Sequence, residues 1–235
     1  MTRRYFVPDL PNAGGPISLP SFEAQHAIRV MRIKVDDTVE LFNGSGLQTE
    51  AKVVQLGRNE CVCLAEAGQI IDREPSASLH LGIALPKPDR AKELIERLTE
   101  LGVQRVTPII AERTQRGPTE SILEKLSKVV IEACKQSGRN HLLQISPPAT
   151  AEQYFHEVSA GKKIIAHPGD QGITLSELIG GGKHQSYAIA IGPEGGWTDF
   201  EYQQAVERGF ESINLGKRIY RIETAAVAVT SVLVS

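Results

Sequence analysis

The pattern of apolar and polar positions changes near residue 75 and divides the chain into two parts. Before this point, short runs in which apolar residues alternate with polar ones lie at residues 39–42, 51–56 and 61–64. Turn residues separate them, most clearly in Asn43-Gly44-Ser45-Gly46. Alternation with a period of two is typical of strands, so we expect a small β-barrel. One short helix, near residues 22–31, interrupts it.

After residue 78 the pattern alternates between buried strands and amphipathic helices. Ala91, Leu94, Ile95 and Leu98 recur at helical spacing, and we expect their helix to end before Gly102. The expected strands are residues 79–85, 106–110, 142–145, 164–167, 187–191 and 213–215, and the expected helices are residues 89–101, 119–136, 150–159, 174–180, 198–209 and 225–234. This alternation predicts an α/β domain with a mostly parallel sheet that is covered on both faces.

A polar stretch that contains a proline lies between the two parts. We therefore expect a first domain at residues 1–72, a linker at residues 73–77 and a second domain at residues 78–235. The last stretch, residues 225–234, is rich in alanine and valine and has no polar face. We expect it to form a wholly buried helix.

Composition and charge narrow the function classes. The chain has 235 residues, of which 41% are hydrophobic and 23% are charged, and its formal net charge is −2. This apolar content excludes an intrinsically disordered protein. Because the bulk charge gives no attraction to nucleic acid, RNA binding has to come from local clusters of Lys and Arg. The longest apolar run has about half the length that a membrane crossing requires, so we expect no membrane span.

The cysteines and the common sequence motifs exclude further classes. Cys61, Cys63 and Cys134 are an odd number and have no second pair or histidine spacing to complete a metal site. We therefore expect no metal, reduced thiols and a cytoplasmic protein. The sequence has no dinucleotide-binding fingerprint, P-loop, serine nucleophile elbow or HExxH motif. The common hydrolase and ATPase classes are excluded.

A glycine-rich segment in the last third of the chain could carry chemistry. Gly192-Pro193-Glu194-Gly195-Gly196 follows an expected strand and leads into a capping box formed by Thr198 and Glu201. A strand, an open glycine loop and a well-anchored helix start are how α/β proteins present backbone amides to a ligand. A tight turn between ordinary elements has the same pattern, so this segment alone leaves both interpretations open.

A second segment follows the expected strand at residues 213–215. It brings Arg218, Arg221 and Glu223 close together just before the apolar terminal stretch. These charges form either the floor of a pocket or a solvated rim whose members pair with one another.

A third segment lies at the end of the helix expected at residues 119–136. Glu132 and Gln136 are one helical turn apart, and Gly138 is expected to end the helix and place Arg139 beyond it. A polar helix end is the simpler interpretation of this segment.

Together these segments resemble the RsmE family of ribosomal RNA methyltransferases, which belongs to the SPOUT superfamily. The similarity runs nearly end to end, and its most specific motifs are residues 191–196 and 215–224. The other matching segments are Arg3-Arg4-Tyr5-Phe6-Val7, residues 26–32, Phe42-Asn43-Gly44-Ser45-Gly46, Pro86-Lys87-Pro88-Asp89-Arg90, residues 99–103 and residues 132–139. Tyr220 departs from the family pattern, in which we expect an aliphatic residue at this position.

The resemblance implies a fold, a cofactor and a reaction. The fold is an N-terminal PUA-like β-barrel and a C-terminal α/β domain with a trefoil knot, assembled as a homodimer with active sites near the subunit interface. The reaction is methylation of uridine N3 in 16S rRNA of the 30S subunit, with S-adenosylmethionine as the donor. Two alternatives are a non-catalytic RNA-binding protein with a degenerate second domain and a SPOUT ribose 2′-O-methyltransferase.

The resemblance also implies the site residues. Three loops hold the donor, the first of which continues to Pro168 and Gly169. Their donor-binding residues are Ala166, His167, Ile191, Gly192, Gly195, Gly196, Leu215, Gly216, Ile219, Tyr220 and Arg221. Arg221 is expected to stabilise negative charge on the uracil oxygens, because a guanidinium stays charged and presents several donors. Glu223 or Glu194 is expected to accept the N3 proton, and His167 is a third candidate.

Basic residues are candidates for RNA contacts in both domains. In the first domain acidic residues are sparse around them. The candidates are Arg3, Arg4, Arg29, Arg32 and Lys34 in the first domain, and Lys87, Arg90, Arg113, Arg116 and Arg139 at the ends of strands or helices in the second. We expect them to form a continuous basic groove in which phosphate contacts position the RNA.

Overall fold

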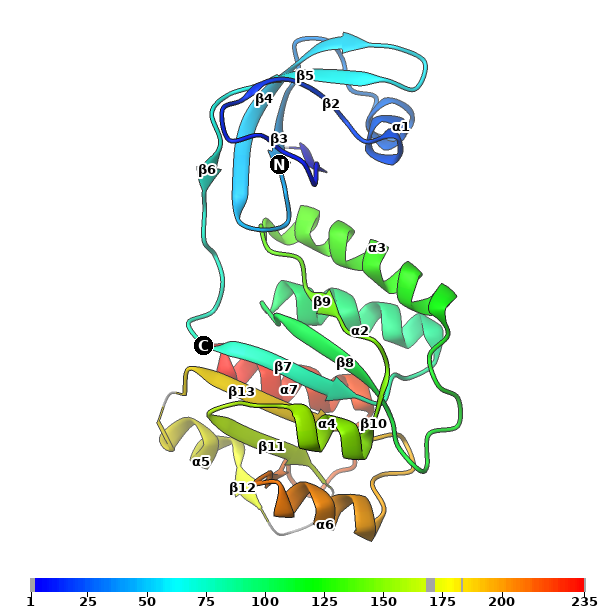
Figure 1. Cartoon of the computed structure of the whole chain (residues 1–235), viewed down its shortest axis with the longest axis vertical. Helices are drawn as coiled ribbons and strands as arrows, with labels where there is room; N and C mark the ends of the chain where they lie inside the picture. Colours follow the sequence, from blue (N-terminus) through cyan, green and yellow to red (C-terminus); the bar gives the residue numbers. More distant parts are fainter. Residues whose placement is uncertain (1–2, 168–171, 183, 235) are drawn as a thin grey trace. The chain divides into compact units, whose positions relative to one another are not determined.

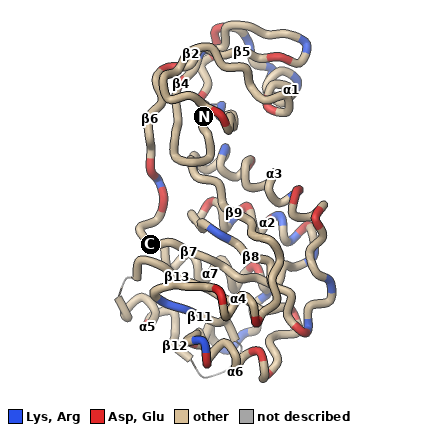
Figure 2. The backbone as a smooth tube through the Cα atoms, viewed as in Figure 1, with Lys and Arg blue, Asp and Glu red and all other residues tan. Residues whose placement is uncertain are grey.

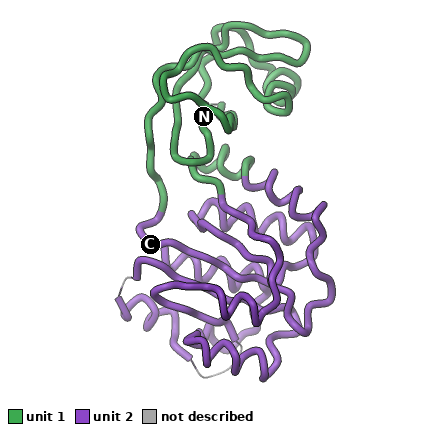
Figure 3. The backbone as a smooth tube through the Cα atoms, viewed as in Figure 1, with its two compact units in different colours: residues 1–74, 131–142 green, residues 75–130, 143–235 purple. Residues whose placement is uncertain are grey.

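The computed structural model describes residues 3–167, 172–182 and 184–234 (Figure 1). The chain divides into two compact units (Figure 3). The first unit comprises Met1–Glu74 together with Ile131–Leu142, and the second comprises Pro75–Val130 together with Leu143–Ser235. The first unit is thus assembled from two separate stretches of the chain.

The first unit is built on a six-stranded sheet and one helix. Its strand order is β1-β3-β4-β5-β2, with β6 paired to β4. The strands β1 and β3 are parallel, and the other pairs are antiparallel. The strands are β1 (Arg3–Phe6), β2 (Gly15–Ser18), β3 (Thr38–Phe42), β4 (Leu47–Leu56), β5 (Cys61–Ala65) and β6 (Gln69–Ile70), and the helix is α1 (Ser21–Arg29). Each strand predicted in this part of the chain lies inside β3, β4 or β5.

The core of the first unit follows from the alternation along these strands. Val39 and Leu41 on β3, Val53 on β4, and Cys61 and Cys63 on β5 are all completely buried. Their neighbours in the sequence point to the other face of the sheet, as the period of a strand requires. The alternating positions seen in the sequence therefore form one hydrophobic cluster.

Residues 131–142 complete the first unit. They are the end of helix α3 (Glu120–Ser137) and the turn that follows it. The backbone N–H of Gly46 donates to the carbonyl of Asn140 over 3.0 Å, and the N–H of Leu142 donates to the carbonyl of Gly44 over 3.0 Å. The predicted glycine turn after β3 is therefore where the second stretch of chain joins the sheet.

The second unit is an α/β domain around a parallel sheet. Its strand order is β10-β8-β7-β13-β11-β14-β12, with β9 paired to β8, and all of these described pairs are parallel. The strands are β7 (Ser78–Ile83), β8 (Arg105–Ile110), β9 (Gln144–Ile145), β10 (Ala149–Thr150), β11 (Lys162–Ala166), β12 (Ile173–Thr174), β13 (Ser186–Ile191) and β14 (Glu211–Asn214). The helices besides α3 are α2 (Pro88–Glu100), α4 (Ala151–Glu157), α5 (Leu175–Gly180), α6 (Asp199–Glu207) and α7 (Ile222–Leu233).

Helices cover this sheet on both sides, which confirms the predicted α/β architecture. Helix α4 lies in front of the sheet in Figure 1 and α7 lies behind it. Helix α2 packs against α7, and α4 packs against α6. The central strand β13 is buried from Tyr187 to Ile191, as a strand covered on both faces should be.

Two predicted elements differ from the structure. The strand expected at residues 142–145 has only two residues, because Leu142 instead pairs with the glycine turn of the first unit. Helix α7 begins at Ile222 and is not wholly buried. Ala225, Ala226 and Val229 face inward, whereas residues 227, 228 and 231–234 remain half-exposed.

The strand order brings three loops to one edge of the sheet. Strand β13 lies between β7 and β11, and β14 lies between β11 and β12. Since β11, β13 and β14 run parallel, their carboxyl ends meet at the same edge. In α/β sheets, ligands bind at this edge where the strand order reverses.

Candidate functional site

A cavity of about 690 Å³ lies at the carboxyl ends of β11, β13 and β14. This volume is in the range of small-molecule and cofactor sites. The loop after β11 contributes Ala166 and His167, and the loops after β13 and β14 contribute most of the remaining wall. All residues predicted to bind the donor line this cavity, while Pro168 and Gly169 lie outside the described residues.

The loop after β13 packs tightly on Trp197. A Cβ atom at Gly192 would lie 2.9 Å from Cε2 of the Trp197 ring, so only glycine fits here without displacing the ring. The indole is buried, and its Nε1 donates to the carbonyl of Ala166 over 3.1 Å. Trp197 therefore ties the loop after β11 to the loop after β13.

The predicted capping box fixes the start of α6. The Thr198 hydroxyl accepts a hydrogen bond from the backbone of Glu201, and the Glu201 side chain accepts one from the backbone of Thr198. Glu201 also accepts a hydrogen bond from the backbone N–H of Glu112 over 2.8 Å. Arg113 then donates to the carbonyl of Gly195 over 2.9 Å. Glu112 and Arg113, which follow β8, thus hold the start of α6 and the glycine loop (residues 192–196) in place.

The loop after β14 presents its backbone to the cavity. Gly216 has a φ of +99°, in the region that favours glycine. Its N–H is directed by a 2.7 Å hydrogen bond to the Asn214 side chain. Ile219 is 86% exposed although it lines the cavity, so its side chain stands at the rim.

Arg90 joins the two candidate acids. It is in the first turn of α2, and its Nη2 donates to Oε1 of Glu194 in the glycine loop. Its Nη1 donates to Oε1 of Glu223, in the first turn of α7, over 3.3 Å. The alternative in which Arg218, Arg221 and Glu223 form a solvated rim and pair with one another is wrong: among the described residues Glu223 pairs with Arg90, while Arg218 and Arg221 line the cavity. The hydrogen bond from Arg90 lowers the pKa of Glu194 below its usual range.

The two acids have different surroundings. The Glu194 side chain is 51% exposed and lines the cavity. The Glu223 side chain is 10% exposed and is not part of the cavity wall. Its Oε2 is buried and has no hydrogen-bond partner among the described residues. Only Glu194 is placed to meet a substrate that enters the cavity.

His167 lies flat on a neighbouring ring. Its imidazole stacks on Tyr202 with the ring centroids 4.4 Å apart, and burial lowers the pKa of His167. Its Nδ1 is buried without a hydrogen-bond partner in the described part of the chain. The ring is therefore neutral at pH 7 and packs as part of the wall.

Several expected RNA contacts need correction because their guanidinium groups are buried. Arg4 is 9% exposed; it pairs with Glu40 and donates to the carbonyl of Cys134 over 2.6 Å. Arg139 is 4% exposed and pairs with Glu74. The guanidinium groups of these two residues are not free to contact phosphate. Arg90 is half-buried instead, and two carboxylates hold it in the cavity wall.

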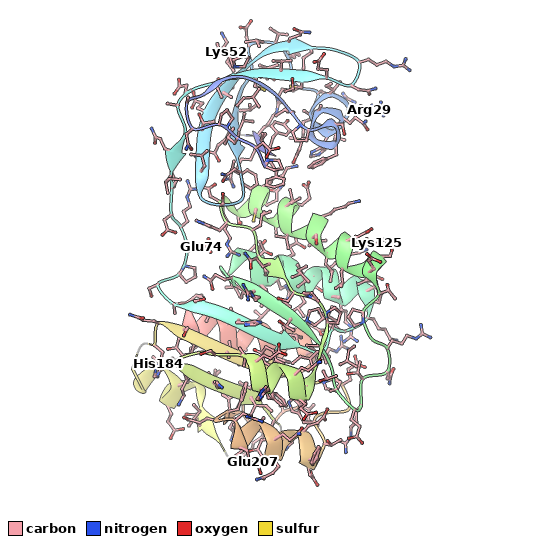
Figure 4. All side chains as sticks on the ribbon, viewed as in Figure 1. Arg29, Lys52, Glu74, Lys125, His184 and Glu207 are labelled. Carbon is pink, nitrogen blue, oxygen red and sulfur yellow. The ribbon has the colours of Figure 1, made fainter. Side chains whose placement is uncertain are left out.

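Other predicted cations remain at the surface. Arg29 projects from α1 (Figure 4), and Arg32, Lys34 and Lys87 are exposed. Arg3 is half-buried and pairs with Asp37. Acidic residues lie among the basic ones along the whole chain (Figure 2).

The third predicted segment does not line the cavity. It belongs to the first unit, where the Nζ of buried Lys135 lies 3.0 Å from Oε2 of Glu23 and 2.9 Å from Oε1 of Glu132. Glu23 is completely buried. The segment therefore joins α3 to the first unit. The spacing of Glu132 and Gln136 along the helix did not indicate that Lys135 between them is buried against Glu23, more than 100 residues away in the sequence.

The part of the chain that the structure describes contains no group of three or more His, Cys, Asp or Glu side chains placed to hold a metal ion. None of its helices combines the length and the apolar character that a membrane crossing requires.

Two family models match this chain. One is described as an RNA methyltransferase domain and matches residues 73–234. The other is described as an RNA methyltransferase PUA domain and matches residues 23–66. The first match covers the whole parallel sheet and the cavity.

Individual relatives are similar over most of their length. The ribosomal RNA small subunit methyltransferase E of Synechocystis is 32% identical over 89% of this chain and 69% of its own length. The protein of the same name from Rickettsia conorii is 30% identical over 90% of this chain and 86% of its own length.

Solved structures show the same fold with a cofactor. A methyltransferase from Legionella pneumophila, in complex with S-adenosylmethionine, has a TM-score of 0.92 at 28% identity and covers 99% of this chain and 97% of its own. A ribosomal RNA small subunit methyltransferase E from Neisseria gonorrhoeae, bound to S-adenosylmethionine, has a TM-score of 0.89 at 28% identity over 98% and 96% of the two chains.

Proposed function

Because this chain belongs to the RNA methyltransferase family that includes ribosomal RNA small subunit methyltransferase E, we propose that it methylates N3 of a uridine in 16S rRNA with S-adenosylmethionine as the donor. The observation that carries the proposal is the cavity, in which three backbone loops meet a carboxylate flanked by cations. A ribosomal substrate also implies a cytoplasmic enzyme.

The wall of the cavity fits the donor. The glycines of these loops carry no side chain into the cavity, and Ala225 keeps one side of the wall small. We assign donor binding to the loops after β11, β13 and β14. When bound, S-adenosylmethionine supplies an electrophilic methyl group.

The charged residues of the cavity suit the uracil base, which is the methyl acceptor of the reaction. Uracil N3 carries a proton that must leave before the nitrogen can attack, and negative charge then develops on the two uracil oxygens. Arg221 lines the cavity, is exposed and caps no helix with its side chain. Its guanidinium is free to stabilise that charge.

Glu194 accepts the proton in this proposal. It is the acid that lines the cavity, and the hydrogen bond from Arg90 lowers the pKa of Glu194, so the carboxyl is ionised at neutral pH. Its half-exposed carboxylate can release the proton to water. Glu223 acts through Arg90 as a positioning residue, since it does not reach the cavity.

Two further observations support the finer features that the family resemblance implies. The half-exposed stripe of α7, at residues 227, 228 and 231–234, is apolar apart from Ser231 and supports a homodimer. The strand order, in which the late strands β13 and β14 lie between earlier ones, supports a trefoil knot. We propose both for this chain, together with an assembled 30S subunit as its substrate.

The test combines donor binding with product identification. We expect calorimetry to detect S-adenosylmethionine binding and mass spectrometry of digested rRNA to find N3-methyluridine after reaction with 30S subunits from a deletion strain. We expect Arg221→Ala to lower the methylation rate by about 100-fold, the typical effect of losing one charge-stabilising donor, with little loss of donor affinity.

Arg208→Ala, an exposed arginine at the end of α6, is the control and should react normally. Methylation of a ribose hydroxyl, or a folded protein that binds no donor, would contradict the proposal. Full activity of Arg221→Ala would remove Arg221 from the mechanism.

A further inference from the structure

The cavity wall carries an uneven set of charges. Among the described residues that line it, Glu194 is the one carboxylate. The cations that line it are Lys87, Arg90, Arg218 and Arg221. The positive sulfonium of the methyl donor does not account for this excess of cations, which suits the oxygen acceptors of an RNA base.

Arg90 holds the Glu194 carboxylate in one orientation. Oε1 of Glu194 accepts a hydrogen bond from Nη2 of Arg90, and within the described residues no group donates to Oε2. Arg90 is anchored by its second contact to the nearly buried Glu223. One carboxylate oxygen is thus left as an acceptor at a fixed place in the wall.

Donors lie directly beside this acceptor. The guanidinium of Arg90 has five N–H groups, and its contacts to Glu194 and Glu223 occupy two of them. Lys87 and Arg221 are also close enough to lower the pKa of Glu194. The wall therefore offers an acceptor with donors next to it.

This arrangement complements one pyrimidine. The pairing edge of uracil presents the N3–H donor between the acceptors O2 and O4. On cytosine, N3 is a lone-pair acceptor, and a carboxylate opposite it would repel it. A site that is built to accept a hydrogen bond binds a base without the matching donor much more weakly, because the acceptor of the site is then left unpaired.

We propose that Glu194, oriented by Arg90, reads the N3–H of the target base and selects uracil over cytosine. This inference rests on the proposed function, because it assumes that an RNA base enters the cavity beside the donor. It adds a selectivity role to Glu194 and a positioning role to Arg90.

The experiment measures binding rather than turnover. Two 30S preparations carry either uridine or cytidine at the rRNA position that the methylation assay identifies. The affinity of the protein for each preparation is measured with S-adenosylhomocysteine present. We expect the unmodified protein to prefer uridine by about tenfold or more. A glutamine side chain offers both an acceptor and a donor, so Glu194→Gln should bring the ratio of the two affinities close to one.

Two more variants make the result interpretable. Glu194→Ala removes the acceptor and adds no donor, so it should weaken uridine binding and, because the repulsion of cytosine N3 is also removed, strengthen cytidine binding. Glu96→Gln, at an exposed position on α2, is the matched control and should keep the full preference.

A wild-type preference in Glu194→Gln, or an equal loss of both affinities, would overturn the inference. The proposed function would survive that result if the unmodified protein still binds S-adenosylmethionine and forms N3-methyluridine. Absence of both would instead overturn the proposed function itself.

Discussion

Gly192 shows how a missing side chain shapes the cavity at the carboxyl edge of the sheet. The space in front of its Cα is filled by the indole of Trp197, whose Nε1 in turn holds the carbonyl of Ala166. A methyl group at residue 192 must push the ring away. Because that ring joins two of the three loops, the effect should reach the donor rather than stay local.

We therefore expect Gly192→Ala to weaken S-adenosylmethionine binding by about tenfold, within the range of 1–3 kcal/mol that overpacking costs. Isothermal titration calorimetry measures this directly. Gly180→Ala is the matched control, since a Cβ at residue 180 meets open space. An unchanged affinity in Gly192→Ala would show that the ring moves without disturbing the loops.

A second residue-scale feature is the buried ion pair between Lys135 and Glu23. Burial raises the pKa of the Glu23 carboxyl, and Lys135 opposes that rise. Lys135→Met leaves the carboxylate buried without its cation, which typically costs about 3–5 kcal/mol in the free energy of unfolding. Urea unfolding followed by circular dichroism, with hydrogen exchange to localise the loss to the first unit, measures it.

The sign of the pH dependence follows from the direction of that pKa shift. In Lys135→Met the folded state holds a proton on Glu23 at a pH where the unfolded state does not, so stability falls as pH rises through the raised pKa. The destabilisation should therefore be smaller at pH 5 than at pH 7. The double variant Glu23→Gln/Lys135→Met should lose this pH dependence, and Lys128→Met, at an exposed position on α3, should behave as the unmodified protein.

At the scale of elements, three helices begin with the same N-terminal capping motif. Thr150, Thr174 and Thr198 each form a complete capping box. Only the last of these helices begins directly after the cavity wall. The local spacing of threonine and glutamate predicted that box, but the same spacing at Thr174 and Glu177 was missed.

This repetition gives an internal control. Thr198→Ala and Thr150→Ala should each lower the free energy of unfolding by about 1 kcal/mol, the usual cost of a lost N-cap. Only Thr198→Ala should also weaken donor binding, because it loosens the start of α6 beside Trp197. Equal donor affinity in the two variants would show that the glycine loop holds its shape without the cap.

Local patterns in the sequence predicted most elements, and the missed ones have physical reasons. The long strands and helices show clear periods of two or 3.6 residues. Strand β2 was missed because Gly15 and Pro16 disfavour a strand and Ile17 is its one buried residue. The cavity loops after β13 and β14 were found because glycines and charges cluster in short segments there, whereas the loop after β11 was expected only from the family resemblance.

What sequence reasoning missed depends on contacts between distant residues. Nothing near Arg4 or Lys135 indicates that each is buried against a partner more than 100 residues away. The bridge from Arg90 to Glu194 and Glu223 likewise joins three segments that only the strand order brings together. Side chains that look like surface charges in the sequence can thus be internal.

At the scale of the whole molecule, RNA affinity must depend on few cations, because the net charge is −2. Arg29 and Arg32 are exposed, whereas Arg4 is buried. We expect Arg29→Ala/Arg32→Ala to flatten the plot of log affinity for 30S subunits against log salt by about 0.9 for each lost phosphate contact. Donor affinity should not change.

Arg208→Ala serves as the control for this measurement as well. A salt dependence in Arg29→Ala/Arg32→Ala equal to that of the unmodified protein would place the RNA elsewhere. Arg4→Ala should behave differently from both, because it removes a guanidinium that donates to Cys134 and pairs with Glu40. We expect it to lower stability instead of the salt slope.

The divided first unit also constrains how the protein is made. A ribosome delivers the chain from its N-terminus, and all six strands of this unit are complete by residue 74. Glu23 and Arg4 must nevertheless wait for Lys135 and Asn140, which at about 5–20 residues per second emerge several seconds later. During that interval two charged side chains lack these partners, so the first unit cannot be completed until more than a third of the second unit has been synthesised.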